Sequence, residues 1–280
     1  MGSQSKIEWT DASFNPVMGC TPVSEACTNC YARRMMGRYA GRKGWPASPD
    51  AVTLFPDRLD MPLHWRRPRR IFVVSMGDLF HEAVPFEFID RVIVTMTSFA
   101  PQHTYLLLTK RPARMREILL NYEDSPAPNI WLGVTCENQA RADERIPLLL
   151  QTPAAVYWVS HEPALGAITY PPEFLALGPR AWLVTGGESG PGARPSHPDW
   201  FRHDRNQCQA AGVPFFFKQW GEWLHKSQFG PHPWPLAKAM HPWESPTGQT
   251  NISYLVGKAR AGHLLDGVEH RAFPGEATHA

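Results

Sequence analysis

Six short apolar runs recur along the chain between residues 71 and 218. Each run is continuously apolar and does not alternate with polar residues, which is typical of strands covered on both faces of a sheet. The first residues of successive runs lie 26 to 33 positions apart, close to the length of a strand with its crossover helix. The pattern therefore predicts parallel strands at residues 71–75, 104–109, 130–135, 156–160, 182–186 and 214–218.

Helix-like segments fill most of the intervals between these runs. We expect the last of them to end at Gly212, because glycine commonly terminates a helix. A short additional strand is expected near the N-terminus, at residues 7–9. The predicted helices are residues 86–99, 113–122, 139–150 and 197–212.

Alternation of strands with helices indicates an α/β fold, and the number of units favours a partial (βα)6-7 TIM-like barrel. We expect this barrel to occupy residues 1–223. Residues 224–280 are rich in Pro, Gly and Trp, so an irregular C-terminal appendage packed on the barrel is expected there.

Composition adds little about partners. The 280 residues are 43% hydrophobic and carry a formal net charge of +2, so charge alone neither indicates nor excludes a nucleic-acid partner. The one dense basic cluster, residues 65–70, is interpreted as a solvated loop in preference to a phosphate contact. The chain has no apolar run of membrane-spanning length and no apolar signal segment at residues 1–9, so we expect a cytoplasmic protein without a membrane partner.

Polar residues follow each predicted strand. In a parallel barrel the carboxyl ends of all strands open onto one face, where catalytic sites lie. Six polar strand ends in succession therefore favour a functional rim over an ordinary solvated surface. The residues at these ends include Gly77, Asp78, His81, Glu82, Lys110, Arg111, Glu137, Asn138, Glu162, Glu188 and Gln219.

Three of the five cysteines, Cys20, Cys27 and Cys30, lie within eleven positions, before the first of the six runs. A reducing compartment disfavours disulfides, so we interpret this trio as metal ligands. Three thiolates without a fourth suit a four-iron four-sulfur (4Fe-4S) cluster with one iron left open. Zinc is the alternative, with His64 or His81 as a fourth ligand.

A family resemblance covers nearly the whole chain. Stretches such as FVVSMGDLFHE, LLLTKRP, NIWLGVTCEN and VTGGESGPGARP, together with the cysteine segment, resemble the phage-associated three-Cys-motif (Gp37/Gp68-type) family. That family in turn is similar to radical S-adenosylmethionine enzymes, which carry a three-cysteine loop after the first strand of a partial βα barrel. The resemblance implies a 4Fe-4S cluster and reductive cleavage of S-adenosylmethionine. The cysteines here are separated by six and two residues, whereas that superfamily has three and two.

The resemblance also suggests roles for individual residues. Gly77 and Asp78 resemble the segment that receives the methionine amino group, and Glu137 and Asn138 resemble the ribose-binding position. For Asn138, a helix N-cap is an equally good interpretation. The string Gly-Gly-Glu recurs literally at residues 186–188, but after a later strand.

Other rim residues could hold a polar or anionic substrate, and we name Lys110, Glu162 and Glu188 as catalytic candidates. Arg111 could clamp a phosphate or carboxylate through its fork of N–H groups. A structural ion pair between Lys110 and either Glu162 or Glu188 is the alternative for the lysine. Lys218 and Gln219 are further candidates for contacting the substrate.

The phage association favours radical modification or rearrangement of a substrate, such as an isomerase acting on a hypermodified thymine base in DNA. Such an enzyme needs a reductase or flavodoxin-type electron donor and would act in the host cell cytoplasm. Arg33, Arg34 and Arg38 could border a site for an extruded base, together with residues 66–70. Two other classes stay open: a non-catalytic iron-sulfur carrier or sensor, and a zinc-bearing nucleic-acid-binding module.

Overall fold

The sheet in the computed structural model of this chain comprises β1 (Ala12–Phe14), β4 (Arg70–Val73), β5 (Thr104–Thr109), β6 (Ile130–Thr135), β7 (Val156–His161), β8 (Ala181–Gly186) and β9 (Phe215–Gln219), in that order. The structure describes residue 5 and residues 7–122, 127–229, 237–244 and 251–275. Six of the strands coincide within two residues with the six apolar runs. The expected parallel α/β architecture is therefore confirmed, and it is consistent with a partial TIM-like fold.

The chain divides into two compact units, which we describe separately. Unit 1 comprises residues 1–135 and 144–158, and unit 2 comprises residues 136–143 and 159–280. The divisions fall after β6, within α4 (Gln139–Leu150) and within β7.

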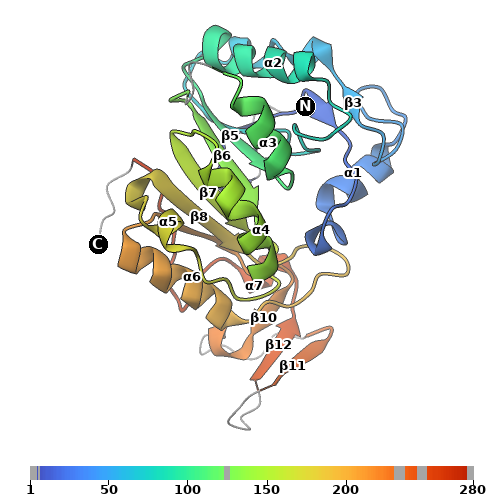
Figure 1. Ribbon diagram of the computed structural model, residues 1–280. Coiled ribbons are helices and arrows are strands. Elements are labelled where there is room, and N and C mark those ends of the chain that lie inside the picture. The colour runs from blue at the N-terminus through green and yellow to red at the C-terminus, as the bar shows by residue number, and fades with distance from the viewer. Residues whose placement is uncertain (1–4, 6, 123–126, 230–236, 245–250, 276–280) are drawn as a thin grey trace. The chain divides into compact units, whose positions relative to one another are not determined.

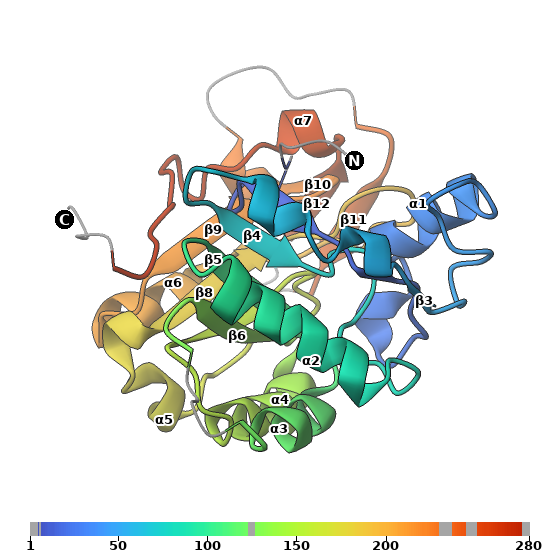
Figure 2. The same ribbon diagram turned by 90° about the horizontal axis from the view of Figure 1, so that it is seen from above.

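Unit 1 is built on parallel pairing of β1 with β4, β4 with β5, and β5 with β6. Helices α2 (Phe86–Val94) and α3 (Pro112–Leu119) lie on one face of these strands (Figures 1 and 2). The apolar residues of β4 and β5 are buried, which explains why these runs do not alternate in polarity. Unit 1 also contains α1 (Tyr31–Tyr39) and the short antiparallel pair β2 (Val17–Met18) and β3 (Thr53–Leu54).

Two details of unit 1 differ from the sequence-based expectation. The first strand is β1, at residues 12–14, and Trp9 precedes it in a turn. The apolar residue at position 9 is explained by packing, because the Trp9 ring contacts Phe72 and Trp158 in the core. The helix expected at residues 86–99 is α-helical only to Val94 and continues as a π-helical turn over residues 95–99.

Unit 2 pairs β8 with β9 in parallel, and α6 (Pro198–Ala211) packs on both strands. The helix α6 begins with Pro198 at its first turn and ends at Gly212, which adopts the left-handed conformation with φ 66°. Glycine carries no Cβ to oppose this conformation, so the predicted helix stop is confirmed. The short helix α5 (Pro172–Leu175) packs on α6.

The C-terminal segment contains more regular structure than expected. Strands β10 (Trp223–His225), β11 (Met240–Trp243) and β12 (Asn251–Leu255) form an antiparallel sheet in the order β10-β12-β11, and α7 (Lys258–Ala261) follows. Pro242 argues against a strand in the sequence. It lies in β11, an edge strand of this sheet, where the missing N–H is tolerated. Part of the segment, residues 230–236 and 245–250, lies outside the described residues.

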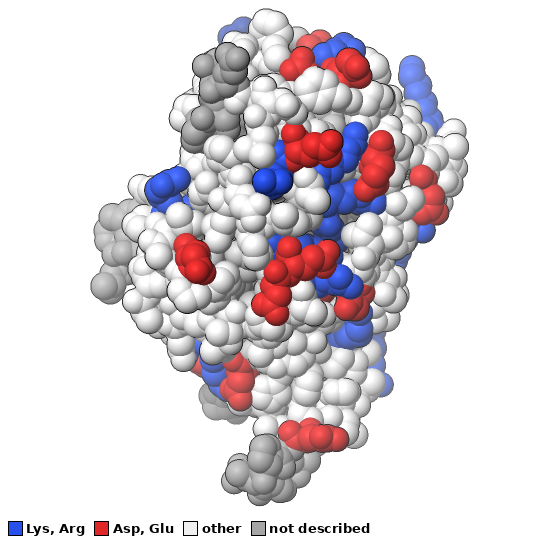
Figure 3. Space-filling model, in the orientation of Figure 1, with Lys and Arg blue, Asp and Glu red and all other residues white. Residues whose placement is uncertain are grey.

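No helix among the described residues is long and apolar enough to cross a membrane. On the face of the molecule drawn in Figure 3, acidic and basic side chains lie close together and do not form a surface of one sign. This face agrees with the small net charge of the chain.

We expect Gly133→Ala to destabilise unit 1 by about 1–3 kcal/mol, because the added Cβ would lie 2.4 Å from the buried ring of Trp158. The shift in the urea unfolding midpoint measures this effect. Gly37→Ala in α1 is the matched control, since its Cβ would meet Pro49 at an ordinary 3.8 Å and alanine favours a helix. Equal stability of the two variants would contradict the packing account.

Candidate functional site

The cysteine loop is attached to the carboxyl end of β4 by a close backbone contact. β4 ends at Val73, and the Gly19 N–H donates to the Met76 carbonyl at 3.0 Å. Gly19 and Gly77 form a parallel bridge, and a Cβ on Gly77 would lie 2.9 Å from the Gly19 carbonyl oxygen. Glycine at position 77 therefore allows the chain's own cysteine loop to approach the strand end.

The three cysteines are free thiols and half-buried. Cys30 directly precedes α1, so the helix fixes one end of the loop. A small buried cluster joins that helix to β2 and to the turn after β4, and it consists of Met18, Ala32, Met36 and Met76. The loop is thus held at both ends by packed structure.

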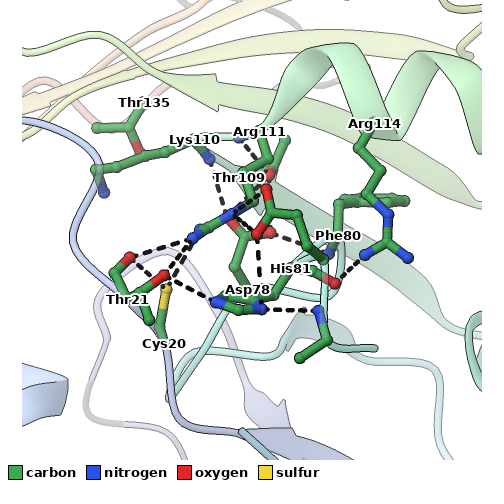
Figure 4. Close-up of polar contacts among 12 residues, drawn as sticks. Cys20, Thr21, Asp78, Phe80, His81, Thr109, Lys110, Arg111, Arg114 and Thr135 are labelled. Carbon is green, nitrogen blue, oxygen red and sulfur yellow. Dashed lines mark hydrogen bonds and ion pairs between the residues drawn. The ribbon is translucent and has the colours of Figure 1, made fainter. Parts of the chain in front are cut away.

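Arg111, at the turn between β5 and α3, extends from the end of β5 to this loop (Figure 4). Its Nη1 donates to Cys20 Sγ at 3.4 Å, and its Nη2 donates to Thr21 Oγ1 at 2.9 Å and to the Thr21 carbonyl at 3.2 Å. Its Nε donates to both carboxylate oxygens of Glu82 at 3.0 and 3.1 Å. All sides of the guanidinium are engaged and Arg111 is buried, so the suggestion that it clamps a substrate phosphate is not supported.

Asp78 holds Arg111 and the end of β5 in place. Its carboxylate accepts hydrogen bonds from Thr109 Oγ1 at 2.8 and 2.9 Å, from the Lys110 N–H at 3.1 Å and from the Phe80 N–H at 3.0 Å. Arg111 Nη1 lies 3.5 Å from the same carboxylate. Asp78 is 4% exposed, which favours this ordering role over receipt of a cofactor ammonium group.

His81 is committed through both ring nitrogens. The Ala83 N–H donates to Nδ1, so the proton lies on Nε2, which donates to Thr21 Oγ1 at 2.9 Å. Burial, with Arg111 nearby, lowers the pKa of His81, which is therefore neutral at pH 7. These bonds leave no lone pair for zinc, so His81 does not fit the fourth ligand of the zinc alternative.

His64, the other candidate zinc ligand, is exposed and pairs with Asp60 one helical turn away. Within the described ranges, no three His, Cys, Asp or Glu side chains are gathered as tightly as one metal ion requires. What the three thiols share is a set of neighbouring cations.

Each thiol faces a cation. Burial raises the pKa of Cys20 to about 11, Asp78 adds to the rise, and Arg111 opposes it. Burial also acts to raise the pKa of Cys27, but the Lys110 ammonium and hydrogen bonds within the loop outweigh it, so this pKa is lowered. Arg33 is held by Asp50, and the charge interactions that raise its pKa include those with Cys30 and Cys20.

Lys110 differs from its neighbour Arg111. The described part of the chain offers its side-chain ammonium no hydrogen bond or ion pair, although its charge acts on Cys27. In unit 2, the carboxylates of Glu162 and Glu188 are each paired with a cation of that unit, Lys218 and Arg194. Lys110 therefore has a charge available for an anionic group.

In unit 2, Glu162 accepts two hydrogen bonds from Lys218 Nζ, at 2.8 and 3.0 Å, and one from Gln219 Nε2 at 3.3 Å. This half-buried cluster at the ends of β7 and β9 therefore brings together Glu162, Lys218 and Gln219, three of the residues predicted to contact the substrate. Glu188 is 5% exposed and accepts from the backbone and the guanidinium of Arg194, closing its own loop.

The residues after β6 make hydrogen bonds within the chain. Asn138 Oδ1 accepts from the Arg141 N–H at 3.1 Å, so the N-cap interpretation for α4 is confirmed. Glu137 is buried, and its carbonyl accepts from the Leu165 N–H. The literal Gly-Gly-Glu string serves packing, because a Cβ on Gly187 would lie 1.9 Å from the Trp220 carbonyl oxygen.

Sequence reasoning missed Thr21, Thr109 and the pairing of Arg33 with Asp50. Thr109 is the last residue of β5, so its position at a strand end was a usable signal. Thr21 has no comparable signal, because its partner His81 lies 60 positions away in the sequence and only folding brings the two side chains together. Asp50 likewise lies in a segment without helix or strand.

Alkylation should distinguish the thiols of the metal-free protein. Because the thiolate is the nucleophile, the lowered pKa of Cys27 and the raised pKa of Cys20 predict that iodoacetamide labels Cys27 faster, by about tenfold or more at pH 7.5. The difference should shrink as the pH approaches 11, where Cys20 ionises. Mass spectrometry of timed samples measures both rates, and faster labelling of Cys20 at neutral pH would refute the assignment.

Comparison with known proteins matches this chain to a family model. Neither the curated proteins nor the solved structures contain a match to this chain. The model of the family described as "Protein of unknown function (DUF5131)" matches residues 4–274, which is nearly the whole sequence. The chain therefore belongs to the DUF5131 family.

Proposed function

We propose that this protein is an iron-sulfur enzyme of the radical S-adenosylmethionine type. In this proposal Cys20, Cys27 and Cys30 hold a 4Fe-4S cluster and leave one iron open. The observation that carries it is that Arg111 donates to Cys20 Sγ at 3.4 Å, while the charges of Lys110 and Arg33 act on Cys27 and Cys30.

Charge balance supports the fit of the cysteines to such a group. Three thiolate ligands bring negative charge into a half-buried loop, where it is costly unless it is compensated. The charge of Lys110 lowers the pKa of Cys27 and favours its thiolate, and Arg111 partly offsets the burial that raises the pKa of Cys20. A soft, all-thiolate donor set suits iron-sulfur clusters and zinc, and the commitment of His81 removes one predicted fourth ligand for zinc.

A bound and reduced cluster would supply the electron that cleaves S-adenosylmethionine. The protein's own residues bind and orient. Arg111 fixes the Cys20 thiol, Asp78 fixes Arg111, and Gly77 keeps the loop against β4. Lys110 has an ammonium available for an anionic group of the cofactor or substrate. Glu162, with Lys218 and Gln219, offers a charged and amide-bearing site for a polar substrate.

The substrate stays a prediction from the family resemblance: a hypermodified thymine base in phage DNA, altered by a radical isomerisation or related modification. Ribose contacts by Glu137 and Asn138 and a flavodoxin-type donor are proposals of the same kind. Incubation of the reduced enzyme with phage DNA, followed by mass spectrometry of the released nucleosides, tests the substrate directly.

Anaerobically purified protein should be brown, contain about four irons per chain, and form 5′-deoxyadenosine from S-adenosylmethionine after reduction with dithionite. Cys27→Ala should lose the colour and the product together, because it removes a ligand. Cys208→Ala is the matched control, since Cys208 is buried in α6 outside the trio. Stoichiometric zinc in colourless protein would refute the proposal, and a cluster without product would favour an electron carrier.

Replacing Lys110 by Gln should reduce the 5′-deoxyadenosine formed per bound cluster by about tenfold or more, because a charge-assisted contact to an anionic group is lost. Lys110→Arg, which keeps the charge, should retain much more of the rate. Lys238→Gln, at an exposed residue, is the control for loss of a lysine. A full rate in the Gln variant would show that Lys110 holds no reacting molecule.

A further inference from the structure

We infer that Arg111 is a positioning residue that holds Cys20 ready for ligation and raises the reduction potential of the cluster bound there. The effect on the potential rests on the proposed function. The effect on the position of the thiol rests on contacts within the chain alone.

A single planar group joins three segments that are far apart in the sequence (Figure 4). The guanidinium of Arg111 extends from the end of β5, contacts Cys20 and Thr21 in the cysteine loop, and contacts Asp78 and Glu82 in the segment after β4. A guanidinium donates in fixed directions, so the position of each partner constrains the others. The Cys20 sulfur is therefore placed relative to the sheet and not only relative to its own loop.

Burial makes this contact electrostatically strong. The Arg111 side chain is 6% exposed, and Asp78, on the side away from solvent, is equally buried. Hydrogen bonds and charges act more strongly where water is excluded. A donor to a ligating sulfur stabilises the electron-rich, reduced state of an iron-sulfur cluster, so Arg111 should raise its potential.

Glu82 balances this charge from the solvent side. Its carboxylate accepts from Arg111 Nε at 3.0 Å, yet its side chain is 67% exposed. Water and salt screen an exposed charge, so Glu82 should lower the potential by less than Arg111 raises it. Replacing Arg111 or Glu82 should therefore shift the reduction potential in opposite directions and by unequal amounts, which a purely structural role of these residues would not produce.

Four variants separate charge from position. Arg111→Gln removes the charge and most of the fork, Arg111→Lys keeps the charge but loses the fork, and Glu82→Gln removes the balancing charge. Arg114→Lys is the matched control, because Arg114 lies in the first turn of α3, which begins directly after Arg111, and donates to the carbonyls of His81 and Val84, not to a thiol.

Redox titration of the reconstituted protein, followed by electron paramagnetic resonance, measures the potential. At a fixed poise we expect Arg111→Gln to lower the ratio of reduced to oxidised cluster about tenfold, equivalent to about 59 mV for one electron. Arg111→Lys should shift the ratio less, and Glu82→Gln should shift it the opposite way. Arg114→Lys should match the wild-type protein.

Hydrogen exchange of the metal-free protein measures the position. The amides of Gly19 and Cys20 donate to the carbonyls of Met76 and Pro49 and are therefore protected. Both Arg111 variants should speed their exchange about tenfold, whereas Arg114→Lys should act on residues 81–84 instead. Arg111→Lys and Glu82→Gln are more conservative substitutions than Arg111→Gln. If Arg111→Gln does not fold, these two variants still give a result.

The inference is overturned if both Arg111 variants keep the wild-type potential and the wild-type exchange of Gly19 and Cys20. Shifts of the same sign in Arg111→Gln and Glu82→Gln would overturn the effect on the potential. If the wild-type protein takes up no cluster, the proposed function fails together with that effect. Exchange of the metal-free chain then still decides whether Arg111 positions Cys20.

Discussion

The balance of charge at the cysteine loop is the constraint on which the account depends. Thiolates that ligate a metal are anions, and fixed cations beside a half-buried loop offset the negative charge that the metal leaves uncompensated. The chain meets this requirement with Arg111 at Cys20, Lys110 at Cys27 and Arg33 near Cys30. Two of the three cations follow one strand, β5, so the sheet itself sets their position.

The parallel fold explains how residues so far apart in the sequence meet. β4 and β5 are neighbours, and their carboxyl ends bring Asp78 next to Thr109 and Lys110. Asp78 then orients Arg111, and Arg111 holds the loop that begins beyond the bridge between Gly19 and Gly77. A short chain of buried polar contacts thus connects the core of unit 1 to the thiols. Burying polar groups costs free energy, and this network offsets that cost because nearly every member has a hydrogen-bond partner.

Much of the fold could be predicted, because continuous apolar runs and their spacing directly reflect burial in a parallel sheet. The first strand was predicted at the wrong residues because Trp9 looks like a strand residue. Its ring packs in the core, but its backbone does not pair with a strand. The C-terminal sheet was missed because Pro242 resembles a strand breaker, although it lies at an edge. The cysteine trio and the polar strand ends were visible in the sequence. Whether a side chain such as Asp78 or Glu188 is free or already paired depends on contacts that span the fold, and spacing does not encode them.

The most direct test of the central claim is the electron paramagnetic resonance spectrum of the reduced, anaerobically reconstituted protein, recorded with and without S-adenosylmethionine. A three-thiolate cluster with an open iron should give a 4Fe-4S signal whose g values change when the molecule binds. An iron-sulfur signal indifferent to S-adenosylmethionine, or a protein that binds zinc in place of iron, would contradict the account.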